Sequence, residues 1–205
     1  MKLDADAALQ RLKDGNQRFV SEALQSEAVA TPSRRREVAV AQEPFAILLG
    51  CSDSRVPAEI IFDQGLGDLF VIRVAGNIVA PSQIDSVEFA AARYDTRLVV
   101  VLGHSTCGAI LATIEELGRK ADEQSRSLRS IVDRVRPSVE PLLATDIGRD
   151  HDALVRHAVR ANIRASVGQL RYGSRLLEQL IRDNGLRVVG AEYNLDSGVV
   201  EFLDT

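Results

Sequence analysis

The sequence predicts an α/β fold built on a mostly parallel sheet. Four short apolar runs, largely β-branched and bounded by Gly, Pro or charged residues, occupy residues 44–50, 68–76, 97–104 and 186–194. Their apolar character is nearly continuous instead of alternating, which is typical of strands buried on both faces. Helical patterns separate the runs, as the crossover connections of a parallel sheet require.

Residues 1–40 are expected to form an N-terminal helical arm. Spaced apolar side chains in residues 6–23 predict an amphipathic helix that is broken or bent at Gly15. The segment that follows contains Arg34–Arg36 and is predicted to be a solvated loop, because three arginines are too few for a basic patch. The predicted sheet does not require this arm, which leaves its helix available to pack against a neighbouring subunit.

Residues 41–205 are expected to form the α/β core of a single domain that spans residues 1–205. Pro137 and Pro141 punctuate the connection before the last helical region, in which Ser174 is the expected N-cap of the final helix. A turn at residues 194–198 returns the chain antiparallel to the fourth strand as a C-terminal edge. The helices between the strands are expected at residues 57–62, 82–94, 107–117 and 150–182.

The composition indicates which binding partners and which cellular compartment to expect. The chain has 205 residues and a net charge of -4, which gives no electrostatic footprint for nucleic acid or an anionic membrane. No apolar run approaches the roughly 18 residues of a spanning helix, and the N-terminus lacks the apolar segment of a signal peptide. We therefore expect a cytoplasmic protein, in which reduced cysteines serve as metal ligands or nucleophiles.

The two cysteines stand at equivalent places in the predicted sheet. Cys51 ends the first strand and is followed by Asp53; His104 ends the third strand and is followed by Cys107. If these strands are neighbours, the four side chains converge at one edge of the sheet and make a plausible tetrahedral zinc set. Two buried structural cysteines are an alternative. A closed structural zinc site is another, although a carboxylate with Arg55 two residues away is a poor permanent ligand for it.

Two motifs carry a resemblance to a known family. "CSDSRVPAE" at residues 51–59 and "HSTCGA" at residues 104–109 resemble the β-class carbonic anhydrases, and the likeness continues through "GDLFVIRVAGN" to the C-terminal hairpin. The resemblance implies that Cys51, His104 and Cys107 bind one zinc ion per chain, and that Asp53 and Arg55 form a dyad beside the metal. It also implies that Gln42 contacts the substrate and that the chains assemble as dimers or tetramers.

One departure from the family concerns regulation. Some members have a tryptophan three residues before the first cysteine, within a regulatory bicarbonate site. Leu48 stands there in this chain, which contains no tryptophan. The resemblance therefore points away from that form of regulation.

The leading hypothesis is a zinc lyase that converts CO₂ and water to bicarbonate and a proton, with zinc-bound hydroxide as the nucleophile. Asp53 either orients the hydroxide while paired with Arg55, or closes the site as the fourth zinc ligand. Two thiolate ligands weaken zinc as a Lewis acid, so activity is expected to rise toward alkaline pH. Alternatives are a CS₂ or COS hydrolase on the same fold, and a non-catalytic zinc-binding protein, which would have no use for the Asp53–Arg55 pair.

Overall fold

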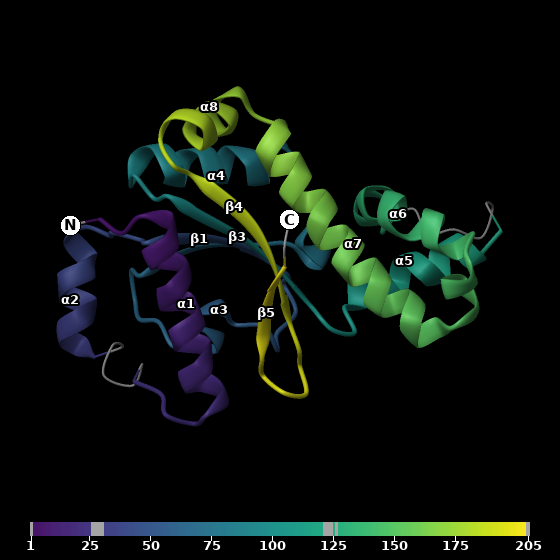
Figure 1. Ribbon diagram of the computed structural model, residues 1–205, viewed down its shortest axis with the longest axis horizontal. Coiled ribbons are helices and arrows are strands. Elements are labelled where there is room, and N and C mark those ends of the chain that lie inside the picture. Colours follow the sequence, from purple (N-terminus) through teal and green to yellow (C-terminus); the bar gives the residue numbers. More distant parts are fainter. Residues whose placement is uncertain (1, 26–30, 121–124, 126, 204–205) are drawn as a thin grey trace.

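The computed structural model, which describes residues 2–25, 31–120, 125 and 127–203, has a central sheet flanked by helices (Figure 1). The sheet has five strands in the order β2-β1-β3-β4-β5, of which the first four are parallel and β5 is antiparallel to β4. This arrangement confirms the predicted fold class. The strands are β1 (Ala46–Gly50), β2 (Leu69–Arg73), β3 (Leu98–His104), β4 (Arg187–Tyr193) and β5 (Val200–Leu203).

The central strands are buried on both faces, as their continuous apolar sequences predicted. Every residue of β1 and β3 is buried. Ile47 and Leu49 belong to the apolar cluster on one face of the sheet, whereas Leu48 belongs to the cluster on the other face. Helices α4 (Pro81–Arg93) and α7 (His151–Tyr172) contribute to the first cluster, and α1 (Ala5–Val20) and α3 (Ala58–Ile61) contribute to the second.

Helix α1 differs from its prediction in two respects. It continues unbroken through Gly15, because the glycine serves close packing: a Cβ at this position would overlap the carbonyl oxygen of Phe62. The helix also packs on the chain's own sheet, where Ala8 and Leu12 are fully buried. The expected break at Gly15 is therefore absent, and the expectation that the sheet does not require this helix is wrong, whereas its packing against a neighbouring subunit stays a prediction.

The predicted loop around Arg34–Arg36 is a helix, α2 (Pro32–Val40). The Thr31 side chain caps it by accepting a 3.2 Å hydrogen bond from the Arg34 N–H, and Pro32 occupies the first turn. A threonine followed by proline favours the start of a helix, and here it outweighs the three charged arginines that suggest a loop. Arg34 anchors the helix to the core through an ion pair of 3.2 Å with Asp68.

Two prolines lie inside α6 (Arg129–Leu143), where the sequence suggested a connection between elements. A proline removes one backbone hydrogen bond and crowds the preceding turn of a helix. Here Val132, Val135 and Val139 recur at helical spacing and are all buried. Burial of this apolar face offsets the cost of Pro137 and Pro141, so the helix persists.

The remaining elements follow the predicted order. The Ser174 side chain caps the last helix by accepting a 3.1 Å hydrogen bond from the Leu177 N–H, as predicted. None of the helices in the described part of the chain is long and apolar enough to cross a membrane. The short elements η2 (Ala75–Asn77) and η3 (Asp146–Arg149) and the helices α5 (Gly108–Gly118) and α8 (Arg175–Asp183) complete the fold.

The contact between α1 and the core makes a testable prediction about two helical glycines. Gly15→Ala should lower the free energy of unfolding by about 1–3 kcal/mol or more, because the added methyl group overlaps the backbone at Phe62. Gly168→Ala on α7 meets nothing within 4 Å, so it should stabilise the protein by up to about 1 kcal/mol through helix propensity. Urea unfolding of both variants measures the difference, and equal effects would contradict the packing role of Gly15.

Candidate metal centre

The side chains predicted to bind metal meet because β1 and β3 are adjacent. The parallel register pairs Gly50 of β1 with Leu102 of β3. Cys51 directly follows β1, and His104 is the last residue of β3, so both side chains lie at the carboxyl edge of the sheet. Thr106 then takes a left-handed conformation with a φ of 50°, and Cys107 follows as the N-cap of α5. The first and third strands are neighbours, as the predicted meeting of these side chains requires.

Cys51, His104 and Cys107 form a compact group of potential ligands. One ligand atom from each residue lies within 4.8 Å of the others, and the two sulfurs are 4.0 Å apart. Two sulfurs bound tetrahedrally at the usual zinc–sulfur length of about 2.3 Å would be roughly 3.8 Å apart. All three side chains are buried, so the group is formed and positioned by the fold itself.

The state of His104 supports the binding of a cation. Nδ1 lies 2.9 Å from the carbonyl oxygen of Ser105, and because this oxygen can only accept, Nδ1 carries the proton. Nε2 then presents a lone pair, and this atom is buried without a hydrogen-bond partner among the described residues. A buried polar atom without a partner is costly, and a metal ion on Nε2 would remove that cost. The group therefore fits zinc.

The two thiols are coupled through a hydrogen bond between their sulfurs. The hydrogen bond between the two sulfurs, together with the one from the Gly76 N–H, lowers the pKa of Cys51. The same hydrogen bond with Cys51, together with burial, raises the pKa of Cys107. Ionisation of one sulfur thus opposes ionisation of the other, and a bound dication would favour the loss of both protons.

Asp53 lies beside the Cys-His-Cys group, and its carboxylate is held by Arg55. The Arg55 guanidinium donates hydrogen bonds of 2.9 and 2.7 Å to the two carboxylate oxygens, and the Arg55 N–H donates a third of 3.0 Å. The side-chain hydrogen bonds from Arg55 hold the pKa of Asp53 well below its usual range. Asp53 Oδ2 is 3.9 Å from His104 Nε2, so the carboxylate adjoins the ligands while paired with arginine.

Arg73 supports the same loop and was not singled out in the sequence. Its Nε donates a 3.0 Å hydrogen bond to the carbonyl oxygen of Cys51, and its Nη2 donates one of 2.6 Å to the carbonyl oxygen of Asp53. Arg73 ends β2, the neighbour of β1. An arginine at a strand end carries no signal for such contacts, because they depend on which strands are adjacent.

Cys51 has a second support in a backbone group. The Gly76 N–H donates a hydrogen bond of 3.3 Å to the Cys51 sulfur. Gly76 has a φ of 72°, a conformation that favours glycine, and lies in η2 directly after β2. The sulfur is thereby held from within the fold while Arg73 holds the carbonyl group of the same residue.

Gln42 lies at the opposite edge of the sheet from these residues. It precedes β1, and its Nε2 donates a 2.8 Å hydrogen bond to the hydroxyl of Tyr94. Because β1 spans five residues, Gln42 and Cys51 are separated by more than about 16 Å of strand. Gln42 therefore does not join the metal-ligating group of its own chain.

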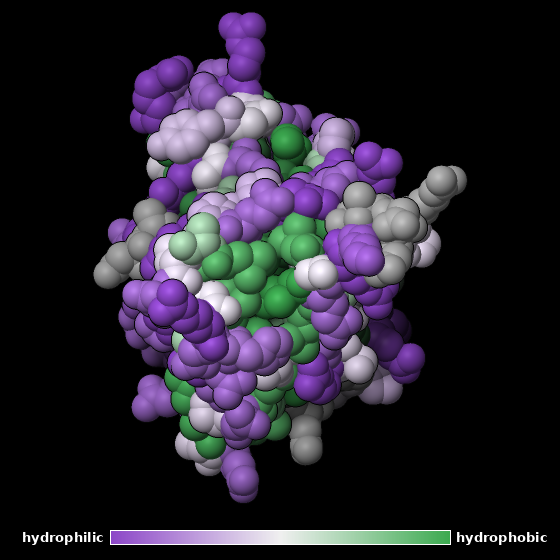
Figure 2. Space-filling model, turned by 90° about the vertical axis from the view of Figure 1, so that its right-hand side faces the viewer, coloured by the Kyte–Doolittle hydropathy of each residue, from purple (hydrophilic) through white to green (hydrophobic). Residues whose placement is uncertain are grey.

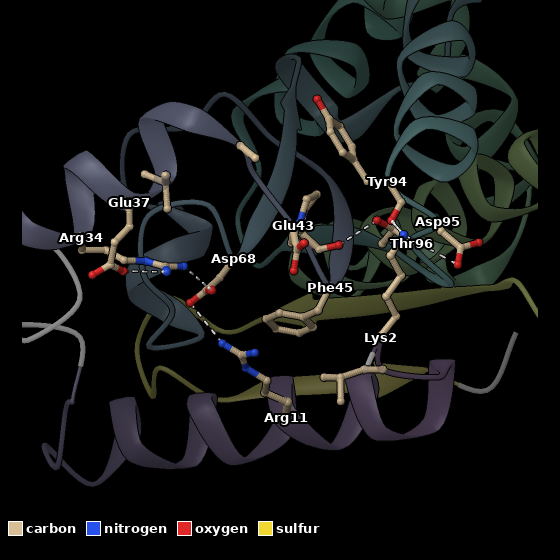
Figure 3. Close-up of a pocket in the computed structure, with 14 residues that line it drawn as sticks. Lys2, Arg11, Arg34, Glu37, Glu43, Phe45, Asp68, Tyr94, Asp95 and Thr96 are labelled. Carbon is tan, nitrogen blue, oxygen red and sulfur yellow. Dashed lines mark hydrogen bonds and ion pairs between the residues drawn. The ribbon is translucent and has the colours of Figure 1, made fainter.

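A cavity of about 590 Å³ lies at that opposite edge (Figure 3). Asp68 forms ion pairs of 3.1 Å with Arg11 and 3.2 Å with Arg34 on one side of it. Tyr94 and Phe45 also line the cavity, whereas none of the metal-ligating residues does. The cavity is therefore separate from the chemistry of the Cys-His-Cys group.

Comparison with known proteins identifies the relatives of this chain. The sequence model of the carbonic anhydrase family matches residues 46–200. The carbonic anhydrase of Mycolicibacterium smegmatis is 38% identical over 195 residues, covering 95% of this chain and 91% of the relative. Carbonic anhydrase 2 of Mycobacterium tuberculosis is 38% identical over 192 residues, covering 94% and 89%.

Solved structures share the fold. The β-carbonic anhydrase CafA of Aspergillus fumigatus has a TM-score of 0.75 at 27% identity and covers 97% of this chain and 90% of its own. A β-carbonic anhydrase of Sordaria macrospora, described as tetrameric, has a TM-score of 0.76 at 24% identity and covers 85% and 88%.

The contacts of Arg73 lead to a prediction about stability. Arg73→Ala leaves the carbonyl oxygens of Cys51 and Asp53 without their charged donor and should lower the free energy of unfolding by about 1–3 kcal/mol. Arg73→Lys should recover only part of this loss, because a single ammonium group lacks the geometry of the guanidinium. Arg182→Ala is a matched control, since this exposed arginine pairs with its sequence neighbour Asp183. Equal unfolding midpoints for Arg73→Ala and Arg182→Ala would contradict the role of Arg73.

Proposed function

This chain belongs to the β class of the carbonic anhydrase family, and we propose that it catalyses the reversible hydration of CO₂ to bicarbonate and a proton with Cys51, His104 and Cys107 as its zinc ligands. The observation that carries the proposal is the buried Cys-His-Cys group, in which Nε2 of His104 lacks a partner among the described residues. When bound in such a site, zinc acts as a Lewis acid that lowers the pKa of a coordinated water molecule.

Asp53 is the residue we assign to orientation of the attacking water. The Arg55 guanidinium keeps the pKa of Asp53 low, so the carboxylate remains an anion that can accept hydrogen bonds but is a poor base. Its oxygens lie next to the ligand atom of His104. A carboxylate fixed there accepts a hydrogen bond from water and directs a lone pair of the oxygen toward CO₂.

Arg55 determines where the carboxylate of Asp53 stays. With both Asp53 oxygens engaged by Arg55, a metal held by Cys51, His104 and Cys107 would stay accessible to water, and this is the open state. Asp53 Oδ2 lies 3.9 Å from His104 Nε2. A carboxylate released from Arg55 would therefore be within reach of a metal bound to this nitrogen. Direct ligation by Asp53 is then the closed state of the same site.

We assign Gln42 to the substrate site of a second chain in a homo-oligomer. Its position at the opposite edge of the sheet excludes a contact with substrate at the zinc site of its own chain. The Sordaria macrospora β-carbonic anhydrases are described as tetrameric. Phe89, which is 53% exposed and contacts the rings of Phe70 and Tyr94, provides an apolar surface beside Gln42.

A second apolar area on the surface supports assembly of the chain into a homo-oligomer. Figure 2 shows it on the side of the molecule where α5 and α6 lie, ringed by polar residues. Contiguous apolar areas of this kind mark interaction sites on protein surfaces. A homodimer or homotetramer would cover such areas.

The role of Asp53 is tested by measuring CO₂ hydration in a stopped-flow instrument with zinc-loaded protein. Asp53→Asn should slow hydration by about 10²-fold, because the anion that positions water is lost. Zinc content should stay at one ion per chain, since Asp53 is not among the three ligands assigned here. The control is Asp146→Asn, whose side chain is 92% exposed on η3. No hydration by native protein with one zinc per chain would refute the proposed function, and an unchanged rate in Asp53→Asn would refute the role of the carboxylate.

Complementation tests whether Gln42 acts in a neighbouring chain. Gln42→Ala and Asp53→Ala should each be nearly inactive alone, whereas their purified mixed dimer should regain about half of the native activity, because one of its two sites has both residues intact. Activity is measured on the mixed oligomer after separation by two affinity tags. A mixture no more active than its parents would place Gln42 outside the partner's site.

A further inference from the structure

Two buried polar side chains of α7 are not used by the proposed mechanism. Asn162 and Ser166 are each 2% exposed and lie one helical turn apart. Their neighbours on the same face, including Ile163 and Val167, belong to the apolar core. A polar group in such surroundings is costly unless it is hydrogen-bonded, so its partners indicate what it does.

Both side chains bind the same short segment, which is 86 to 89 residues away in the sequence. Asn162 Nδ2 donates a hydrogen bond of 2.8 Å to the carbonyl oxygen of Gly76. Ser166 Oγ donates one of 3.0 Å to the carbonyl oxygen of Asn77. Helix α7 thus holds two consecutive carbonyl groups of η2.

This segment has a backbone conformation that needs such support. Gly76 and Asn77 are both left-handed, with φ values of 72° and 42°. For a residue other than glycine this conformation is strained, and it persists where the surroundings determine it. Space is also limited, because a Cβ at Gly76 would lie 2.9 Å from the Cβ of Ala109 on α5. The segment is therefore fixed between α5 and α7.

The consequence of this conformation is the direction of one N–H group. The Gly76 N–H points at the Cys51 sulfur, at a distance of 3.3 Å. A hydrogen bond to a thiolate withdraws negative charge from the sulfur and fixes its position. Partners of metal ligands act in this way, and their loss commonly lowers metal affinity by about 10- to 100-fold.

We propose that Asn162, assisted by Ser166, is a positioning residue for the zinc thiolate of Cys51, acting through the backbone of Gly76. The inference rests on the ligand set proposed above. In this proposal helix α7, which is remote in sequence, fixes the direction of the Gly76 N–H toward the sulfur of Cys51. Neither residue contacts the ligands directly, and neither belongs to the motifs that carry the resemblance to the family.

Asn16 offers a matched comparison. It is also a buried asparagine, 6% exposed, and its Nδ2 donates hydrogen bonds to the carbonyl oxygens of Ile61 and Gly198. Its Oδ1 accepts a 2.8 Å hydrogen bond from the Val200 N–H. Asn16 lies on α1, against the opposite face of the sheet from Asn162, so its replacement destabilises the fold without disturbing Gly76.

The experiment compares Asn162→Leu and Asn16→Leu in the full-length protein. Zinc affinity, measured by competition with a chromophoric chelator under conditions where both variants are folded, should fall about 10- to 100-fold in Asn162→Leu and stay unchanged in Asn16→Leu. In cobalt-substituted protein, loss of the N–H···S hydrogen bond should move the sulfur-to-cobalt charge-transfer band to longer wavelength. Ser166→Ala, which removes only a hydroxyl group, should cause a smaller change in the same direction and serves if Asn162→Leu does not fold.

The outcomes separate this inference from the proposed function. Native affinity and an unshifted band in both Asn162→Leu and Ser166→Ala would overturn it. Equal losses of affinity in Asn162→Leu and Asn16→Leu would also overturn it, because they would reflect general destabilisation. Cys51→Ser is the reference for the ligand set: if this variant binds zinc as tightly as the native protein, the assignment of Cys51 fails, whatever Asn162 does.

Discussion

The candidate metal centre depends on the parallel pairing of β1 with β3. This pairing places the residues that follow Gly50 beside those that follow Leu102, so Cys51 and the His104–Cys107 segment meet at one edge of the sheet. Both strands are fully buried, and a shift by one residue would turn each apolar side chain to the other face. The same core packing that stabilises the sheet therefore sets the distance between the ligands.

Around this pairing, each ligand is held by a group from another element. β2 supplies Arg73 to the carbonyl group of Cys51, and η2 supplies the Gly76 N–H to its sulfur. His104 is held by the carbonyl oxygen of Ser105, and Cys107 by its position as the N-cap of α5. Such supports keep the ligand atoms close together. This proximity has a cost, because once one thiol has lost its proton the neighbouring thiol loses its own less readily, and metal binding requires both to be deprotonated.

The sequence was informative about the ligands and less so about their supports. Cys51, His104 and Cys107 stood at strand ends, and apolar runs show where strands end. The supporting contacts of Arg73 and Asn162 depend on strand order and helix packing, which local patterns do not encode.

The differences between the predicted and the observed helices have a related cause. The local preferences of Gly15 and of the prolines of α6 predict breaks, whereas close packing at Phe62 and a buried valine stripe keep both helices continuous. The helix α2 is different, because Thr31 followed by Pro32 is a local start signal that the sequence itself contains.

The exposure of Arg55 supports the proposed change of partner of the Asp53 carboxylate. The Arg55 side chain is 56% exposed and that of Asp53 is 17% exposed, so water competes for the guanidinium and screens the pair. The backbone beneath Asp53 is instead tied to β2 through Arg73. A transfer of the carboxylate from Arg55 toward His104 then requires rotation of one side chain on a fixed loop. Because Cys51 shares that loop, this fixed backbone lets Asp53 move without displacing the thiolate beside it.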